Sequence, residues 1–444
     1  MDKETVIKKI EEKRDLISDT ADKIWEYAEL SLQEKKSCEL YCRILEAEGF
    51  VVEKGISGIP TAFSASFGSG RPVIGILAEY DALSGLSQER FSTERKPIET
   101  GGNGHGCGHN LLGAGALAAA LGLKEYLSEP GREGTVILYG CPGEEGWASK
   151  AFMAKDKVWE QIDAALTWHP YDKNEIVTGS SNACIQVKYT FKGIASHASG
   201  APEKGRSALD AVELMNIGVQ FLREHMDESA RVHYAITDAG GVSPNVVQPR
   251  AEVLYMVRSP KVKDALELQK RVDKIAEGAA LMTETEFERE LIDGLSEIVP
   301  NNTLEKLLFE NYMLLGTPEF SKEELEFAGK LYKTYGCEEK SLSLKLEELC
   351  SEEKFEATST DVGDVSWLTP TAQIHVAAWP EDCPGHSWQN VSSAGSSVGH
   401  KAAIHAGKVL ALTAIDLIEK KEVLDKAKEE FRERTKGGYY CPVA

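Results

Sequence analysis

Short apolar runs alternate with helix-periodic segments early in the chain, and this alternation restricts the fold more than any other feature. The runs Val73–Leu77, Val136–Tyr139 and Ala164–Thr167 are bounded by turn residues, and helical stretches such as Leu111–Tyr126 separate them. Strands that alternate with helices are typical of a doubly wound α/β sheet. Each run leads into ionisable residues, and such sheets bind ligands beyond the carboxyl ends of their strands. The sequence therefore predicts where the functional edge lies.

The pattern changes near residue 184, where a second set of elements begins. Its expected strands and helices follow the order β-α-β-β-α-β, which is the split βαβ order of a ferredoxin-like domain. They cover Cys184–Phe191, Ser207–His225, Val232–Thr237, Val253–Arg258, Val262–Leu281 and Phe287–Ile292. Helical segments return after Asn301. We therefore expect a catalytic domain formed by residues 1–182 and 295–444, with residues 183–294 inserted as a separate α+β domain.

Charge and composition exclude several classes of partner. The 444 residues include 50 basic and 71 acidic side chains, and the net charge of −21 repels phosphate backbones and anionic membrane surfaces. The longest run poor in polar residues, Leu111–Leu123, is shorter than the roughly 20 residues of a membrane span. Nine cysteines without framework spacing indicate reduced thiols, and no secretory signal is recognisable. We expect a cytoplasmic protein that binds neither nucleic acid nor membrane.

The segment His105–Asn110 is the strongest candidate for metal chemistry. It contains Cys107 and His109, two ligand types that zinc prefers, separated by a single glycine. Gly108 gives the backbone the freedom to direct both side chains into one cavity. The alternative interpretation is a glycine-rich turn with an incidental cysteine.

Three further signals lie at the same predicted edge. The adjacent carboxylates Glu144 and Glu145 follow a predicted buried strand, so one can bind a metal while the other transfers protons. His169 ends another strand-like run, and His386 lies in a loop near the C-terminus. Taken singly, paired glutamates usually form a solvated face and such histidines are usually structural. Their shared position makes the combination more specific than any one of them.

Several motifs occur together in a fixed order along nearly the whole chain. They are Glu79-Tyr80-Asp81-Ala82-Leu83, His105-Gly106-Cys107-Gly108-His109-Asn110, Glu144-Glu145-Gly146, His169, Ser196-His197-Ala198, Gly240-Gly241 with Asn245, and Gly385-His386. In this order they resemble the dinuclear metal amidohydrolases of peptidase family M-twenty, in the branch that includes aminoacylases and auxin-conjugate hydrolases. The resemblance implies a zinc-peptidase-like α/β catalytic domain and an inserted ferredoxin-like domain that serves as lid and dimerisation domain.

The resemblance also implies a metal centre. It assigns two divalent ions to five ligands, namely Cys107, His109, Glu145, His169 and His386. Glu144 becomes the general base. A cysteine ligand favours zinc, with manganese as the alternative. The chain departs from the clan's His-x-Asp pattern by having Glu79-Tyr80-Asp81, which argues against Glu79 as a ligand and favours Asp81 as the residue that orients one.

In the inserted domain the resemblance implies substrate-binding roles. It suggests that His197 and Asn245 polarise the scissile carbonyl and that Arg258 binds the substrate carboxylate, with His233 in a supporting position. A surface ion pair is the alternative for Arg258. Two further carboxylates, Asp361 and Asp364, either lie near the metals or are turn residues. The inserted domain is also expected to form a homodimer.

Taken together, the motifs predict metal-dependent hydrolysis of the amide bond in an N-acyl amino acid, with a p-aminobenzoyl-glutamate-like molecule as substrate. A dipeptidase of the same family is the alternative, because its leaving amino acid presents the same carboxylate to Arg258. A non-catalytic binding or scaffold protein would be expected to lack a ligand or the base. Neither is missing from the motifs.

Overall fold

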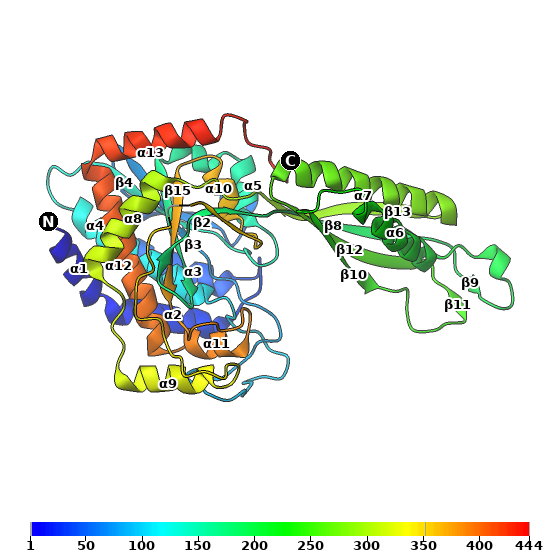
Figure 1. Cartoon of the computed structure of the whole chain (residues 1–444), viewed down its shortest axis with the longest axis horizontal. Helices are drawn as coiled ribbons and strands as arrows, with labels where there is room; N and C mark the ends of the chain where they lie inside the picture. The colour runs from blue at the N-terminus through cyan, green and yellow to red at the C-terminus, as the bar shows by residue number, and fades with distance from the viewer. Residues whose placement is uncertain (1, 351, 444) are drawn as a thin grey trace. The chain divides into compact units, whose positions relative to one another are not determined.

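A computed structural model describes residues 2–350 and 352–443, and these form two compact units (Figure 1). The first unit comprises the residues up to Gly179 together with Val299–Lys354 and Val365–Tyr439. The second comprises Ser180–Ile298, Phe355–Asp364 and the C-terminal residues from Tyr440 onward. The domain boundaries expected from the sequence, 1–182, 183–294 and 295–444, stay a prediction.

The first unit is built on a seven-stranded mixed sheet with the strand order β1-β2-β4-β3-β5-β15-β6. Its strands are β1 (Val51–Lys54), β2 (Phe63–Ser69), β3 (Val73–Ala78), β4 (Gly134–Gly140), β5 (Ala164–Tyr171), β6 (Glu175–Ile176) and β15 (Thr371–Ala377). Parallel pairing joins β3 to both β4 and β5, and joins β5 to β15. The carboxyl ends of these four strands therefore meet at one edge of the sheet, as the sequence predicts.

Both faces of this sheet are covered, because successive side chains of a strand point to opposite faces. On β3, Ile74 and Ile76 join the large core that contains α4 (His109–Leu127) and α12 (Ser397–Glu419), whereas Leu77 joins a smaller core on the other face. Gly115 of α4 permits close packing, because a Cβ there would lie 2.4 Å from Nε1 of Trp168. This close packing holds the first turns of α4 against β5, where Nε1 of Trp168 also donates to the carbonyl oxygen of Leu112.

The remaining elements connect and cover these layers. The helices are α1 (Lys3–Glu12), α2 (Arg14–Tyr27), α3 (Lys35–Ala47), α5 (Ser149–Lys155), α8 (Asn302–Leu315), α9 (Lys322–Tyr332), α10 (Val362–Ser366), α11 (Trp388–Ala394) and α13 (Lys421–Arg434), with short 3₁₀ turns η1 (Ile56–Gly58), η2 (Val158–Gln161) and η3 (Pro202–Lys204). Short strands are β7 (Gly179–Ser181), β9 (Ser196–His197), β11 (Val246–Val247) and β14 (Lys354–Glu356). Within the described ranges, no helix combines the length and apolarity that crossing a bilayer requires.

The second unit contains a four-stranded antiparallel sheet in the order β10-β12-β8-β13. Its elements are β8 (Ala183–Lys192), α6 (Ala208–Arg223), β10 (Arg231–Asp238), β12 (Arg250–Ser259), α7 (Val262–Thr283) and β13 (Glu286–Leu295). Alternate buried residues of β8 and β12 pack with those of α6 and α7 in one core. This is the β-α-β-β-α-β order expected for a ferredoxin-like domain. The predicted fold class, an α/β catalytic domain with an inserted α+β domain, is confirmed.

Candidate metal centre and active site

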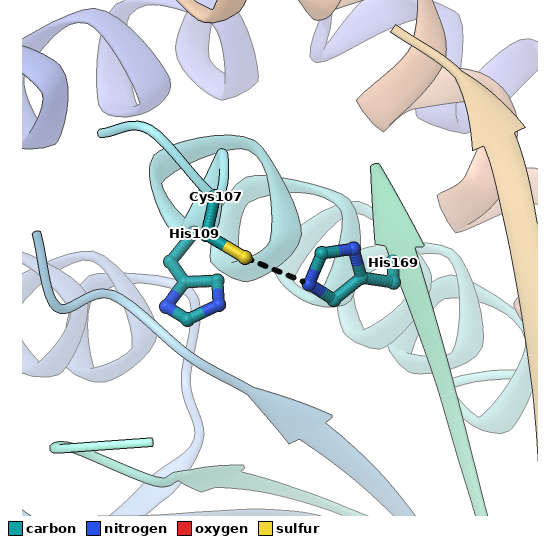
Figure 2. A group of neighbouring side chains, drawn as sticks. All are labelled: Cys107, His109 and His169. Atoms are coloured by element: carbon teal, nitrogen blue, oxygen red, sulfur yellow. Dashed lines mark hydrogen bonds between the residues drawn. The ribbon is translucent and has the colours of Figure 1, made fainter. Parts of the chain in front are cut away.

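The loop before α4 directs Cys107 and His109 to one place. Gly108, the residue between them, caps α4 with φ 73°, a left-handed conformation that glycine adopts without strain. Sγ of Cys107 lies 3.3 Å from Nε2 of His169, which extends from β5 (Figure 2). His109 is the first residue of α4 and is completely buried. Three donor side chains from two segments of the chain thus converge.

Asp81 orients the ring of His109. Its Oδ1 lies 2.9 Å from Nδ1 of His109, so a neutral ring that donates from Nδ1 presents the lone pair of Nε2. Its Oδ2 accepts hydrogen bonds from the hydroxyl of Ser31 at 2.9 Å and from the backbone N–H of Glu145 at 3.0 Å. Burial opposes ionisation of Asp81, but these hydrogen bonds outweigh it and lower its pKa to about 2. Asp81 therefore links two of the candidate ligands.

His169 has its proton fixed by the backbone. Nδ1 donates to the carbonyl oxygen of Pro170 at 2.7 Å, which leaves Nε2 as the acceptor that faces Cys107. Burial lowers the pKa of His169 to about 3, so the ring is neutral. Burial and the carboxylate of Glu145 raise the pKa of the Cys107 thiol. A half-buried thiol with a raised pKa is a poor nucleophile, and a bound cation would favour its thiolate form.

The loop that carries Glu144 and Glu145 follows β4 and is held by two buried carboxylates. The backbone N–H of Gly143 donates to Oε1 of Glu34 at 2.9 Å, and that of Glu145 donates to Asp81. Glu34 is completely buried, and burial together with the charge of Asp81 raises its pKa to about 7. The positions of both glutamates are therefore set by segments distant in sequence.

His386 completes the set of five candidate ligands. It lies in the loop after β15 with φ 52°, and its side chain is 55% exposed. Nε2 of His386 is 3.4 Å from Oε1 of Glu145. The exposed position of His386 contrasts with the buried His109 and places the cluster at the solvent boundary.

The donor atoms fit the binding of divalent ions. They form three groups within which all donor atoms lie within 4.8 Å of one another: Cys107 with His109 and His169, Cys107 with Glu145 and His386, and Glu79 with His109 and Glu144. Nε2 of His109 and Oε1 of Glu145 are buried and make no hydrogen bond. Each nevertheless lies 3.3 to 3.4 Å from another donor atom. Two ligands at about 2.1 Å from one tetrahedral ion are about 3.4 Å apart. The separations therefore suit ligands that share an ion.

The structure adds residues that the sequence did not indicate. Lys150 of α5 is completely buried, and its Nζ lies 2.6 Å from Oε1 of Glu79. Glu34 and Ser31 likewise support the cluster through the contacts given above. A lysine in a helix and a glutamate before a helix are usually solvated, so no local pattern distinguished these residues.

In the inserted unit, His197 ends the short strand β9, and Asn245 directly precedes β11, the strand that pairs with it. Nδ1 of His197 accepts hydrogen bonds from the backbone N–H groups of Gly200 at 3.1 Å and Ser199 at 3.3 Å. The ring proton therefore lies on Nε2, which can donate to a carbonyl oxygen. The backbone carbonyl of Asn245 accepts from the N–H of Ala198 at 3.0 Å. His197 is exposed.

The other predicted residues of this unit have different surroundings. Arg258 on β12 donates from Nη1 to Oγ of Ser359 at 2.8 Å, a contact with a neutral hydroxyl. His233 is exposed on β10, beside an open cavity of about 490 Å³ that is also lined by Arg223. Asp364 accepts two hydrogen bonds from Ser296, which favours the structural interpretation of this carboxylate.

Comparison with known proteins identifies the family. Residues 181–283 match the model of the peptidase dimerisation domain. The chain is 43% identical to a subunit of p-aminobenzoyl-glutamate hydrolase from Escherichia coli (strain K12), over 98% of this chain and 96% of that protein. The chain belongs to peptidase family M-twenty. As a member of family M-twenty it is a metal-dependent enzyme that hydrolyses amide or peptide bonds.

Two further relatives illustrate the range of family M-twenty. Xaa-Arg dipeptidase of Mus musculus is 29% identical over 97% of this chain and 92% of that protein. The YxeP protein of Bacillus subtilis, described as a dinuclear metal-binding peptidase, has a similar fold with a TM-score of 0.59 and 17% identity, over 92% of this chain and 99% of that one. The M-twenty fold is thus shared well beyond the proteins of similar sequence.

Proposed function

We propose that this M-twenty enzyme cleaves the amide bond between an acyl group and an amino acid, with p-aminobenzoyl-glutamate-like molecules as substrates. The observation that carries the proposal is the convergence of thiol, imidazole and carboxylate donors beside Glu144. The similarity to the Escherichia coli p-aminobenzoyl-glutamate hydrolase protein, which extends over nearly the whole of both chains, supports the substrate class.

The proposed metal centre holds two divalent ions through Cys107, His109, Glu145, His169 and His386. The thiol and imidazole donors favour zinc, and manganese is the alternative. When bound, such ions lower the pKa of water and polarise a carbonyl group. Asp81 serves the centre indirectly by orienting His109 and the backbone of Glu145.

The protein groups then divide the reaction among them. Glu144 accepts a proton from the attacking water and returns it to the leaving amine. His197 donates from Nε2 to the oxygen of the scissile carbonyl, and Asn245 assists it. Arg258 binds the carboxylate of the leaving amino acid through its planar guanidinium, with His233 in a supporting position.

We propose that the inserted unit also forms a homodimer. Its edge strand β10 exposes Tyr234 and Ile236, and helix α6 exposes Ile217 and Phe221, the last with 72% of its surface accessible. Exposed apolar side chains beside an open strand edge are typical of an interaction surface. The match of this region to a peptidase dimerisation domain supports the same proposal.

We also propose that the protein acts in the cytoplasm. The nine cysteines are free, which suits a reducing compartment.

A dipeptidase is the second candidate function, and the similarity to Xaa-Arg dipeptidase favours it. Both reactions release an amino acid with a free carboxylate, so both would use the same residues. Parallel assays with p-aminobenzoyl-glutamate, other N-acyl amino acids and dipeptides that end in arginine would separate them. The zinc-loaded and the manganese-loaded protein should each be tested.

The central experiment replaces the proposed base. Glu144→Gln should retain the metals and lose activity by about 10² to 10⁴, because an amide cannot accept the proton of water. Glu160→Gln, at an exposed position outside the cluster, is the matched control and should keep full activity. A metal-loaded Glu144→Gln variant with normal turnover would refute the assignment.

A further inference from the structure

The carboxylate of Glu79 lies between two groups of different kinds. Glu79 follows β3 and is only 2% exposed. Its Oε1 lies 2.6 Å from Nζ of the buried Lys150. Its Oε2 lies 3.3 Å from Nε2 of His109. The two oxygens therefore face separate partners.

The contact between Glu79 and His109 is not a hydrogen bond. Nε2 of His109 is buried and has no hydrogen-bond partner, while Nδ1 of the same ring faces Asp81. A carboxylate on the Nδ1 side orients a ligating histidine, whereas a carboxylate on the Nε2 side lies where the lone pair meets a cation. Glu145 and His386 form a comparable close donor pair, but there the atom that is buried without a hydrogen bond is Oε1 of the carboxylate and not a ring nitrogen.

Lys150 explains how Glu79 is held in this position. The lysine lies on α5, directly after the loop that carries Glu144 and Glu145. A fully buried ammonium group is strongly unfavourable unless it is paired, so Lys150 requires a carboxylate nearby. By holding Oε1, it restricts rotation of the carboxylate and keeps Oε2 directed toward His109.

We propose that Glu79 is a further metal ligand that binds through Oε2 to the ion held by His109, and that Lys150 is the residue that positions it. This rests on the proposed function, because it requires that the centre binds divalent ions. The donor atoms of Glu79, His109 and Glu144 all lie within 4.8 Å of one another. The departure from the clan's His-x-Asp pattern, which by sequence alone argues against Glu79 as a ligand, still leaves a carboxylate donor at this position.

Zinc titration against a competing chelator tests the proposal in the purified full chain. The variants are Glu79→Gln and the double variant Glu79→Gln/Lys150→Met, which removes both charges of the buried pair. Each should bind one of the two ions at least about 10-fold more weakly than the wild type. The double variant should retain near-normal thermal stability, because no unpaired charge remains. Glu324→Gln, which disrupts a pair with Lys401 outside the donor cluster, is the control and should bind zinc normally.

The outcomes separate this proposal from the proposed function. Normal binding of both ions by the double variant would overturn the role of Glu79 alone. Wild-type protein that takes up no divalent ion would overturn the proposed function and this proposal with it. A crystal structure of the zinc-loaded wild type provides the second measurement. Oε2 of Glu79 within about 2.2 Å of an ion is the expected result, and a carboxylate bound to neither ion would contradict it.

Discussion

Gly108→Ala tests whether the backbone of the Cys107 loop sets the geometry of the metal centre. Gly108 has φ 73°, and an alanine held in this left-handed region costs about 1 to 2 kcal/mol. The added Cβ would also lie 3.0 Å from the ring of Trp379 and 3.1 Å from Cγ of Pro170. Because Pro170 lies on β5 and Trp379 is buried, the start of α4 must move instead. Crowding of this kind adds about 1 to 3 kcal/mol.

Gly101→Ala is a matched control for the backbone contribution. Gly101 has φ 75°, but a Cβ at this position would have no atom within 4 Å. The control should therefore lose only the 1 to 2 kcal/mol or so that the left-handed conformation costs. The difference in unfolding free energy between the two variants isolates the effect of crowding by Trp379 and Pro170.

Urea unfolding of the metal-free proteins and zinc titration of the folded proteins provide the two measurements. Gly108→Ala should be less stable than Gly101→Ala, and it alone should bind zinc more weakly, because the shift separates Cys107 from His169. Equal stability of the two variants, together with normal zinc affinity in both, would refute the argument that this glycine positions the donors.

Three further predictions concern other parts of the molecule. Cys107 should react with an alkylating reagent more slowly in zinc-loaded than in metal-free protein, and equal rates by mass spectrometry would contradict its role as a ligand. Burial disfavours the charged form of Glu305 and raises its pKa from 4.5 to about 7. The neutral carboxyl group is therefore compatible with the fold below about pH 4.5, and this stability is lost as the pH rises through about 7. The unfolding free energy of Glu305→Gln should therefore rise by about 2 to 3 kcal/mol relative to that of the wild type between about pH 5 and pH 8. A difference that does not vary with pH would contradict this. An equal gain in the control Glu310→Gln, at an exposed position, would also contradict it. Arg258→Ala should lower kcat/KM about 10- to 100-fold for substrates with a free carboxylate and leave their amidated counterparts nearly unchanged, and equal losses would exclude Arg258 from substrate binding.

The sequence predicts those parts of the fold in which local pattern and burial agree. The strands β3, β4 and β5 are continuous apolar runs, because helices cover both faces of the parallel part of the sheet. Strand β2, Phe63–Ser69, was not predicted, because its serines and glycine give no continuous apolar run. Apolar residues recur at helical spacing from Val6 to Ala28, which by itself predicts one helix, but the structure divides this segment at Lys13 into α1 and α2. Both helices face the same core, so the apolar period does not reveal the break.

In the candidate site, too, the sequence indicates only those residues that a local pattern distinguishes. Cys107 and His109 can be recognised because both lie in one short segment, on either side of the glycine that lets them converge. Lys150 and Glu34 could not be recognised, because their burial depends on segments brought together only by the tertiary fold. A charged residue in a polar stretch has the same local pattern whether it is solvated or buried in an ion pair.

Asp81 shows how this fold couples donors from different segments. Its Oδ1 faces the ring of His109, which begins α4, and its Oδ2 accepts from the backbone of Glu145, which follows β4. One carboxylate thus determines the orientation of one candidate ligand and the backbone position of another. Any displacement of the loop after β3 would therefore disturb two of the donor groups at once. Since Glu79 lies two residues before Asp81 and also faces His109, this short loop contacts both nitrogens of the same ring. The Glu-x-Asp sequence is therefore a structural part of the centre, although it lies outside the Cys-Gly-His and Glu-Glu motifs.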